Sequence, residues 1–141
     1  MKLLVPVDGS DPSLRAVKLA IGLAKKAPRS DIVLVNVQDT STLDLGELGL
    51  VSPARLRQLA LQTGEKALKK ANALCKAARL RFTARLEIGP VAETIIRIAR
   101  RERANHIIMG TRGLGGVRGL LLGSVTTQVV HLSSVPVTLV K

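Results

Sequence analysis

The residues of this sequence with the clearest chemical pattern lie between Gly110 and Ser124. Their spacing is Gly-x2-Gly-x9-Gly-Ser, met at Gly110, Gly113, Gly123 and Ser124, directly after a short apolar run. Because glycine has no side chain, backbone N–H groups in such a segment can come close to an anion. Ser124 suits the N-cap of a following helix, whose N-terminus carries partial positive charge. The pattern therefore predicts a turn that binds phosphate; an ordinary surface loop with a helix cap is the alternative.

The segment does not match the other common phosphate-binding motifs. A Walker loop requires a lysine directly before its serine or threonine, and here that position is Gly123. The dinucleotide fingerprint Gly-x-Gly-x-x-Gly begins at Gly113 and Gly115 but has Arg118 in its third place. Kinase signatures are absent from the sequence. The longer spacing is therefore the pattern to be explained.

Side chains suited to covalent or metal-dependent catalysis are few. Neither His106 nor His131 has a serine, cysteine or acid at the spacing of a catalytic triad, so we expect structural histidines. Two histidines and Cys75 cannot assemble a credible zinc site. No activating base is evident for the hydroxyls of Ser10 and Thr111. We therefore expect a binding protein with no catalytic residues, no metal held by side chains, and at most slow hydrolysis of a bound ligand.

Strand and helix patterns alternate along the whole chain and position these residues. Apolar runs predict strands at residues 2–7, 32–37, 82–88, 106–109 and 135–140. Periodic apolar positions and Ser or Pro starts predict helices after Pro12, from Ser52-Pro53, after Gly89-Pro90 and over 124–133. Such alternation predicts a parallel sheet with helices on both faces. Ligands of these sheets bind beyond the carboxyl ends of strands, where the Asp8 turn and the glycine segment both fall.

Length and composition indicate one folded domain over residues 1–141. Apolar residues make up 46% of the chain, but no run is long enough to span a membrane, and the N-terminus lacks a signal-peptide core. A lone cysteine fits a reducing compartment, so we expect a cytoplasmic protein. The net charge of +12 favours anionic ligands, whereas one Phe and no Tyr or Trp leave no platform for stacking bases. Nucleic acid is therefore kept as an alternative partner and not as the main one.

The glycine spacing resembles the nucleotide-binding signature of the universal stress protein family. The segments LLVPVDGSDPSLRAVKLA, IVLVNV and HIIMGTRG are similar to that family's first, second and fourth strand regions, so the resemblance covers essentially the whole chain. It implies a Rossmann-like α/β three-layer sandwich, related to the adenine nucleotide alpha hydrolases, with a five-stranded parallel sheet of order 3-2-1-4-5. One branch of the family binds ATP through these glycines. The resemblance thus implies an ATP-binding protein of the stress response, with Mg²⁺ bound through the phosphates.

The resemblance also assigns roles to residues of this chain. Asp8 would accept hydrogen bonds from the ribose, with capping of its own turn as the alternative, and the backbone of Val37 would pair with the adenine edge. Arg112 and Arg118 could neutralise phosphate charge. The complete nucleotide-binding set implied is Pro6, Val7, Asp8, Val37, Met109, Gly110, Arg112, Gly113, Gly123, Ser124 and Val125.

The last predicted strand is the segment through which we expect two copies of the chain to associate. In the resembling family this edge of the sheet pairs across a two-fold axis, so we expect a homodimer through Val135 to Val140, limited but not prevented by Pro136. Two alternative functions remain open. One is a basic dimeric module for protein or nucleic-acid contacts with an unused nucleotide pocket, and the other is a slow ATPase.

Overall fold

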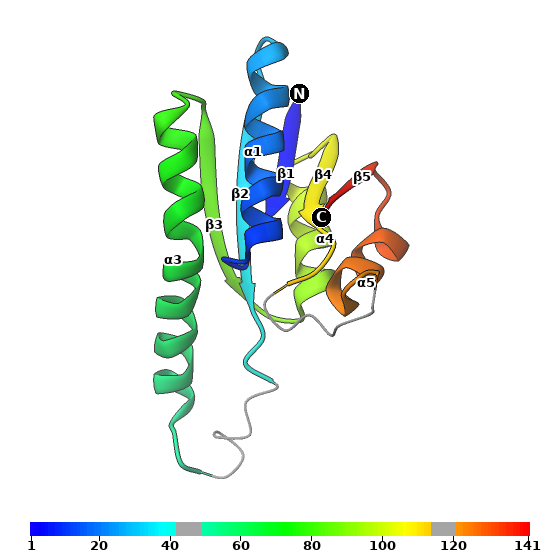
Figure 1. Ribbon diagram of the computed structural model, residues 1–141. Helices are drawn as coiled ribbons and strands as arrows, with labels where there is room; N and C mark the ends of the chain where they lie inside the picture. The colour runs from blue at the N-terminus through cyan, green and yellow to red at the C-terminus, as the bar shows by residue number, and fades with distance from the viewer. Residues whose placement is uncertain (42–48, 114–120) are drawn as a thin grey trace.

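Five parallel strands form one sheet with helices on both faces in the computed structural model, which describes residues 1–41, 49–113 and 121–141 (Figure 1). The strands are β1 (Lys2–Pro6), β2 (Asp31–Gln38), β3 (Phe82–Ile88), β4 (His106–Gly110) and β5 (Val137–Val140). The helices of the described ranges are α1 (Asp11–Lys26), α3 (Pro53–Ala77), α4 (Val91–Arg101) and α5 (Ser124–Leu132). None of these helices is both long and apolar enough to cross a membrane.

The strand order is β3-β2-β1-β4-β5, which confirms the order 3-2-1-4-5. The central strands β1 and β2 are nearly continuous apolar runs because both of their faces are covered. β3 lies at one edge, which explains its alternating sequence Phe-Thr-Ala-Arg-Leu-Glu-Ile and its exposed central residues. β5, at the other edge, begins at Val137 and is shorter than the predicted strand over 135–140.

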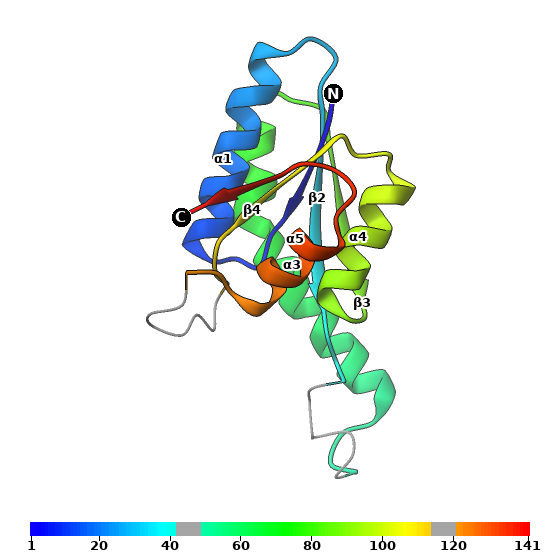
Figure 2. The ribbon, with the colours of Figure 1, turned by 90° about the vertical axis from the view of Figure 1, so that its right-hand side faces the viewer.

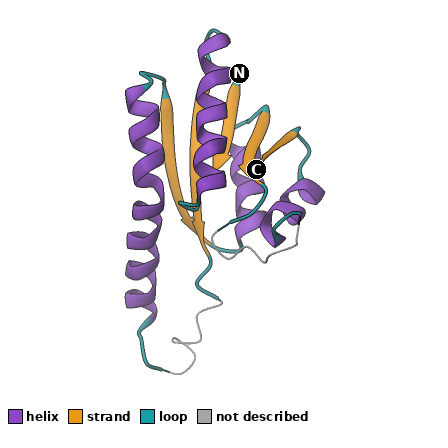
Figure 3. Ribbon diagram, in the orientation of Figure 1, coloured by secondary structure: helices purple, strands orange, loops and turns teal. Residues whose placement is uncertain are grey.

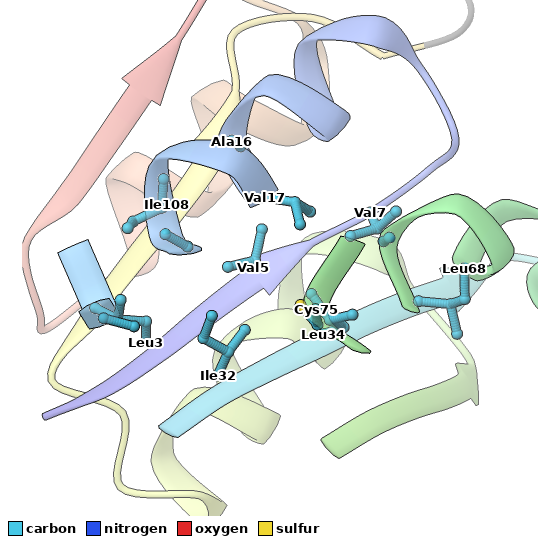
Figure 4. Packing of buried hydrophobic residues seen from close by; sticks show 13 residues of the cluster. Leu3, Val5, Val7, Ala16, Val17, Ile32, Leu34, Leu68, Cys75 and Ile108 are labelled. Atoms are coloured by element: carbon cyan, nitrogen blue, oxygen red, sulfur yellow. The ribbon is translucent and has the colours of Figure 1, made fainter. Parts of the chain in front are cut away.

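Two apolar clusters, one on each face of the sheet, hold the layers together. Helices α1 and α3 cover one face and α4 and α5 the other, as the two perpendicular views (Figures 1 and 2) and the view coloured by secondary structure (Figure 3) show. The cluster under α1 and α3 is drawn in Figure 4, where Val5 and Leu34 from the two central strands lie among Val17 of α1 and Leu68 and Cys75 of α3.

The helix starts follow the predicted signals with one exception. The Ser10 and Ser52 hydroxyls accept hydrogen bonds from the N–H groups of Ser13 (3.3 Å) and Arg55 (3.2 Å), which makes both serines N-caps. The prediction that Ser124 caps the last helix is wrong. Gly123 occupies the N-cap, Ser124 is the first helical residue, and no side chain caps this end.

Candidate functional site

A pocket of about 410 Å³ opens where β1 and β4 reach their carboxyl ends. The strand order reverses between these two neighbours, so the pocket lies at the switch point at which ligands of doubly wound sheets bind. The β1–β4 register pairs Leu3 with His106 and Leu4 with Ile107. No further β1–β4 pair follows among the described residues. Pro6, two residues after Leu4, still pairs with Val35 of β2 but has no N–H to donate toward β4. The two strand ends are therefore free to diverge around the pocket.

Every residue of the predicted nucleotide-binding set lines this one pocket. They come from three separate parts of the chain: the end of β1, the end of β2, and the segment from β4 to the start of α5. The pocket-lining residues are Pro6, Val7, Asp8, Val37, Met109, Gly110, Arg112, Gly113, Gly123, Ser124 and Val125. Arg118, which the sequence offered as a second cation, lies outside the described residues.

Sequence reasoning missed the rest of the lining. These residues are Ser13, Val35, Val91, Ile95 and Thr126. Val91 and Ile95 belong to the apolar stripe of α4, and Val35 to a buried strand, so their residue types indicated core packing. They stand where this core borders the pocket, and Val35 and Ile95 line it with only 1% and 2% of their surfaces exposed. No motif in the sequence marks this border.

The pocket has an apolar part and a polar part. Side chains of β2, α4 and β4 (Val35, Val37, Val91, Ile95 and Met109) make the apolar part. The polar part comes from the Asp8 carboxylate, the exposed Arg112 guanidinium and the start of α5. Such a slot suits a ligand with a flat, weakly polar group at one end and negative charge at the other.

Two hydrogen bonds to backbone carbonyls hold the start of α5 against the end of β4. The Gly123 N–H donates to the Thr111 carbonyl at 2.7 Å, and the buried Thr126 hydroxyl donates to the Gly110 carbonyl at 3.0 Å. With no side-chain cap at Gly123, the first N–H groups of α5, at Ser124 and Val125, remain available for an anion.

The three glycines of the spacing, Gly110, Gly113 and Gly123, are required for different physical reasons. A Cβ on Gly110 would lie 2.8 Å from the Cβ of Pro12, so glycine lets the start of α1 pack on β4. A Cβ on Gly113 would overlap the Asp8 carboxylate oxygen Oδ2. A Cβ on Gly123 would meet only an ordinary contact at 3.5 Å, with the Cα of Arg112. Packing therefore explains Gly110 and Gly113 and leaves the glycine at position 123 to be explained by the pocket.

Asp8 both shapes its turn and faces the glycine segment. Its Oδ1 accepts a hydrogen bond from the Ser10 N–H at 2.9 Å, while Oδ2 lies beside Gly113. Between Asp8 and Ser10, Gly9 has a positive φ of 86°, which lets the chain turn sharply. The capping role that the sequence left as an alternative is thus present, together with an orientation toward the pocket.

Two of the remaining candidate reactive groups, His106 and Cys75, have structural surroundings, and His131 is exposed on α5. The His106 Nε2 atom lies 2.7 Å from the Thr138 hydroxyl of the neighbouring strand, as expected for a structural histidine. Burial raises the pKa of the Cys75 thiol to about 11, which disfavours the nucleophilic thiolate. Within residues 1–41, 49–113 and 121–141, no group of three or more His, Cys, Asp or Glu side chains is arranged to hold a metal ion.

The fold and the pocket define a class: a doubly wound α/β protein with a pocket, part apolar and part polar, at the switch point of its sheet. The profile of the universal stress protein family matches residues 1–141, and the chain belongs to this family. The universal stress protein MJ0531 of Methanocaldococcus jannaschii is 33% identical over 140 residues, covering 99% of this chain and 81% of that protein.

Solved structures of the family share the fold. MJ0577 of the same organism superimposes with a TM-score of 0.85 at 26% identity, over 99% of this chain and 94% of that one. A universal stress protein in complex with cAMP gives 0.66 at 24% identity, over 99% and 95%. An Arabidopsis thaliana member with AMP bound gives 0.69 at 20% identity, over 100% and 91%.

Proposed function

We propose that this universal stress protein binds ATP, as its Mg²⁺ complex, in the pocket between β1 and β4. The observation that carries the proposal is the convergence of the predicted set, from three parts of the chain, on one pocket with an apolar slot beside an uncapped helix start. The bound nucleotide would make the domain of residues 1–141 a signalling or protective module of the cytoplasmic stress response. Two structurally similar family members in complex with cAMP and AMP support an adenine nucleotide as the ligand.

The two parts of the pocket match the two ends of ATP. The base fits the apolar slot beside Val37, and the phosphates fit the N–H groups at the start of α5. Asp8 lies between these regions and suits the ribose hydroxyls, because a carboxylate accepts hydrogen bonds strongly. Arg112 adds a cation for the triphosphate.

Mg²⁺ fits this pocket through the nucleotide and not through a side-chain cage. Mg²⁺ prefers oxygen ligands and keeps several waters, so phosphate oxygens with one or two carboxylates satisfy it. Asp8 is the one carboxylate among the described residues that line the pocket. The absence of an evident base among these lining residues also argues that any hydrolysis of ATP is slow.

The test is calorimetric titration of ATP into the protein and its Asp8→Ala and Asp11→Ala variants. Asp11 lies in the exposed first turn of α1 and is a control of equal charge change. Loss of hydrogen bonds to a charged group at Asp8 should weaken ATP binding about tenfold or more. Equal affinities of the two variants would contradict the placement of ATP. Asp8→Asn, which can still accept from the Ser10 N–H, separates loss of charge from loss of the turn.

We also propose that the protein is a homodimer through β5. This strand ends the sheet with one side unpaired by any described strand, and all four of its residues are half-buried. Edge strands of this kind can pair with a second copy across a two-fold axis. Analytical ultracentrifugation should give twice the mass of the 15.0 kDa chain; a monomer at micromolar concentration would contradict this proposal.

A second candidate function, binding of a polyanion, is favoured by the distribution of charge. Helices α1 and α3 carry ten basic and two acidic residues, a net +8 of the +12 of the whole chain. None of the five salt bridges among the described residues involves either helix. Lys66, Lys69 and Lys76 line an open hollow along α3. This face suits a nucleic-acid backbone without base readout.

Salt dependence distinguishes this second function from general basicity. The logarithm of the affinity for double-stranded DNA should fall with the logarithm of salt concentration, with a slope of about −0.9 for each phosphate that the protein neutralises. Replacing Lys66, Lys69 and Lys76 by Gln should make this slope shallower, whereas the same change at Arg97, Arg100 and Arg101 on the opposite face should not. Equal effects of both triple variants would show that only net charge matters.

A further inference from the structure

Asn36 is a buried amide next to the pocket that the proposed function does not use. It lies in β2 with 2% of its surface exposed. Its Nδ2 donates to the Val7 carbonyl of the neighbouring chain segment at 2.7 Å, and its Oδ1 accepts from the Gln38 Nε2 at 2.8 Å. Because a carbonyl can only accept, the atom that faces Val7 must be the amide donor.

The Val7 carbonyl is the atom that the backbone of Val37 would be expected to bind. The Val7 N–H donates to the Val35 carbonyl at 2.7 Å, so the peptide group of Val35 faces β1. The Gln38 carbonyl accepts from the N–H of Gly89, which follows β3, at 3.0 Å, so Gln38 faces the other side. Peptide groups of successive residues in a strand point to opposite sides, so Val35 and Val37 both face β1. Continuing the parallel ladder would pair the Val37 N–H with the Val7 carbonyl. Although the structure describes both residues, no such bond forms between them.

We propose that Asn36 is a positioning residue that keeps the backbone of Val37 open for base recognition. Its amide occupies the Val7 carbonyl, so the ladder stops one step early and the Val37 N–H and C=O stay available at the pocket that Val37 lines. This inference rests on the proposed ATP site. The inference explains how that site would distinguish one purine base from another.

A backbone N–H and C=O side by side form a donor–acceptor pair of fixed order. Adenine offers the matching pair, an acceptor ring nitrogen beside an amino donor. Hypoxanthine and guanine present a ring N–H beside a carbonyl, which places donor against donor and acceptor against acceptor. The geometry therefore predicts selection of ATP over ITP, with no contribution from the Val37 side chain.

Tight packing keeps the Asn36 amide in this orientation. A Cβ on Gly64 of α3 would lie 2.7 Å from the Asn36 Oδ1, so glycine at this position lets the helix lie directly over the amide. The Gln38 Nε2 donates a hydrogen bond to the same oxygen at 2.8 Å. The donor end is thereby left facing Val7.

The test compares binding of ATP, ITP and tripolyphosphate by the wild-type protein and by Asn36→Ala and Asn105→Ala variants. Asn105 is the control because its Oδ1 accepts from the Lys2 N–H at 2.7 Å at the opposite end of the sheet. The wild type and Asn105→Ala should prefer ATP over ITP by about tenfold or more. In Asn36→Ala the Val37 N–H can bond the released Val7 carbonyl, so the preference should fall to near unity with tripolyphosphate binding unchanged. Full ATP preference in Asn36→Ala would overturn the inference.

Amide hydrogen exchange of the wild-type protein gives a second readout that needs no variant. In the nucleotide-free protein the Val37 amide should exchange much faster than that of Val35, and ATP should slow it while ITP does not. A Val37 amide protected without nucleotide would refute the role of Asn36 whether or not ATP binds. If the wild type binds ATP and tripolyphosphate equally and the Val37 amide exchanges rapidly, the proposed ATP site is rejected. The rapid exchange would still support the inference that the Val37 N–H is not paired with the Val7 carbonyl.

Discussion

At the scale of single residues, the contact between Asp8 and Gly113 links two chain segments more than a hundred positions apart. Oδ2 of Asp8 occupies the space into which any side chain at position 113 would project. The glycine spacing in the sequence indicated backbone access to phosphate. The structure adds a second reason for one of these glycines, which is room for a carboxylate.

Replacing Gly113 by alanine should therefore impair the site and not the fold. The added methyl group must displace either Asp8 or the chain at residue 113, both of which line the pocket. We expect ATP affinity to fall about tenfold, since one charge-assisted hydrogen bond is lost, with little change in melting temperature. In an Asp8→Ala background the same substitution should cost much less, because the two residues are coupled. Additive effects in this double-mutant cycle would contradict the contact.

How far the residues of the site could be predicted depended on their type. Gly113 stands out through the glycine spacing and Asp8 through its place directly after the first predicted strand, and the family resemblance assigned both a role. In the sequence, Asn36 is a single polar residue within an apolar strand, and Ile95 is one of several apolar residues that a helix directs into the core. Their roles arise from which backbone atom or cavity lies beside them. That is a property of tertiary packing, which periodicity does not encode.

At the scale of elements, the close approach of α3 to the sheet depends on one glycine within a helix. Besides the Asn36 amide, a Cβ on Gly64 would lie 2.7 Å from the Leu86 Cδ1 of β3. Strand and helix positions were predicted well from apolar runs and from Ser and Pro starts. The start of α5 was predicted less well, because the Gly123–Ser124 pair offers two capping residues and the sequence does not decide between them.

Gly64→Ala and Gly22→Ala should change stability in opposite directions. In α1, a Cβ on Gly22 meets nothing within 4 Å, so alanine should stabilise the protein by up to about 1 kcal/mol through helix propensity. At Gly64 the same gain is outweighed by overpacking, which costs about 1–3 kcal/mol. Urea denaturation measures both free energies of unfolding. A stabilised Gly64→Ala variant would show that α3 can shift outward without cost.

The ion pairs between β3 and α4 predict a pH dependence of stability. Arg101 and Arg97 bind the Glu87 carboxylate at 2.8 and 3.0 Å, and hydrogen bonding and charge lower its pKa from the ordinary value of 4.5. A lowered folded-state pKa stabilises the protein above the unfolded pKa, and this stabilisation is lost as the pH falls through the folded-state value.

Glu87→Gln should consequently destabilise the protein at neutral pH and have less effect in acid. We expect a loss of about 0.5–1 kcal/mol at pH 7, since these are partly exposed pairs. The difference should shrink as the pH falls below the ordinary pKa of 4.5 and through the lowered folded-state pKa. Glu93→Gln on α4 is the control, because Glu93 makes none of the salt bridges among the described residues. A pH-independent difference between Glu87→Gln and the wild type would show that the pairs contribute no charge effect.

At the scale of the whole molecule, the pocket and the charge lie on different parts of the surface. The ten basic residues of α1 and α3 cover one face, whereas the pocket opens at the carboxyl ends of the strands. A basic protein binds any polyphosphate to some degree, so binding of ATP alone does not demonstrate a nucleotide site. In a nucleotide site the base and the ribose must contribute to the affinity beyond the charge of the phosphates.

Thermal melting with Mg-ATP and with Mg-tripolyphosphate, at physiological salt, tests that contribution most directly. A ligand present at about 100 times its dissociation constant stabilises the folded state by about 2.7 kcal/mol. For a domain of this size the melting temperature should rise by roughly 5–15 °C. We predict a rise of this order with ATP and little change with tripolyphosphate. Equal rises with both ligands would contradict a nucleotide site and attribute the binding to net charge.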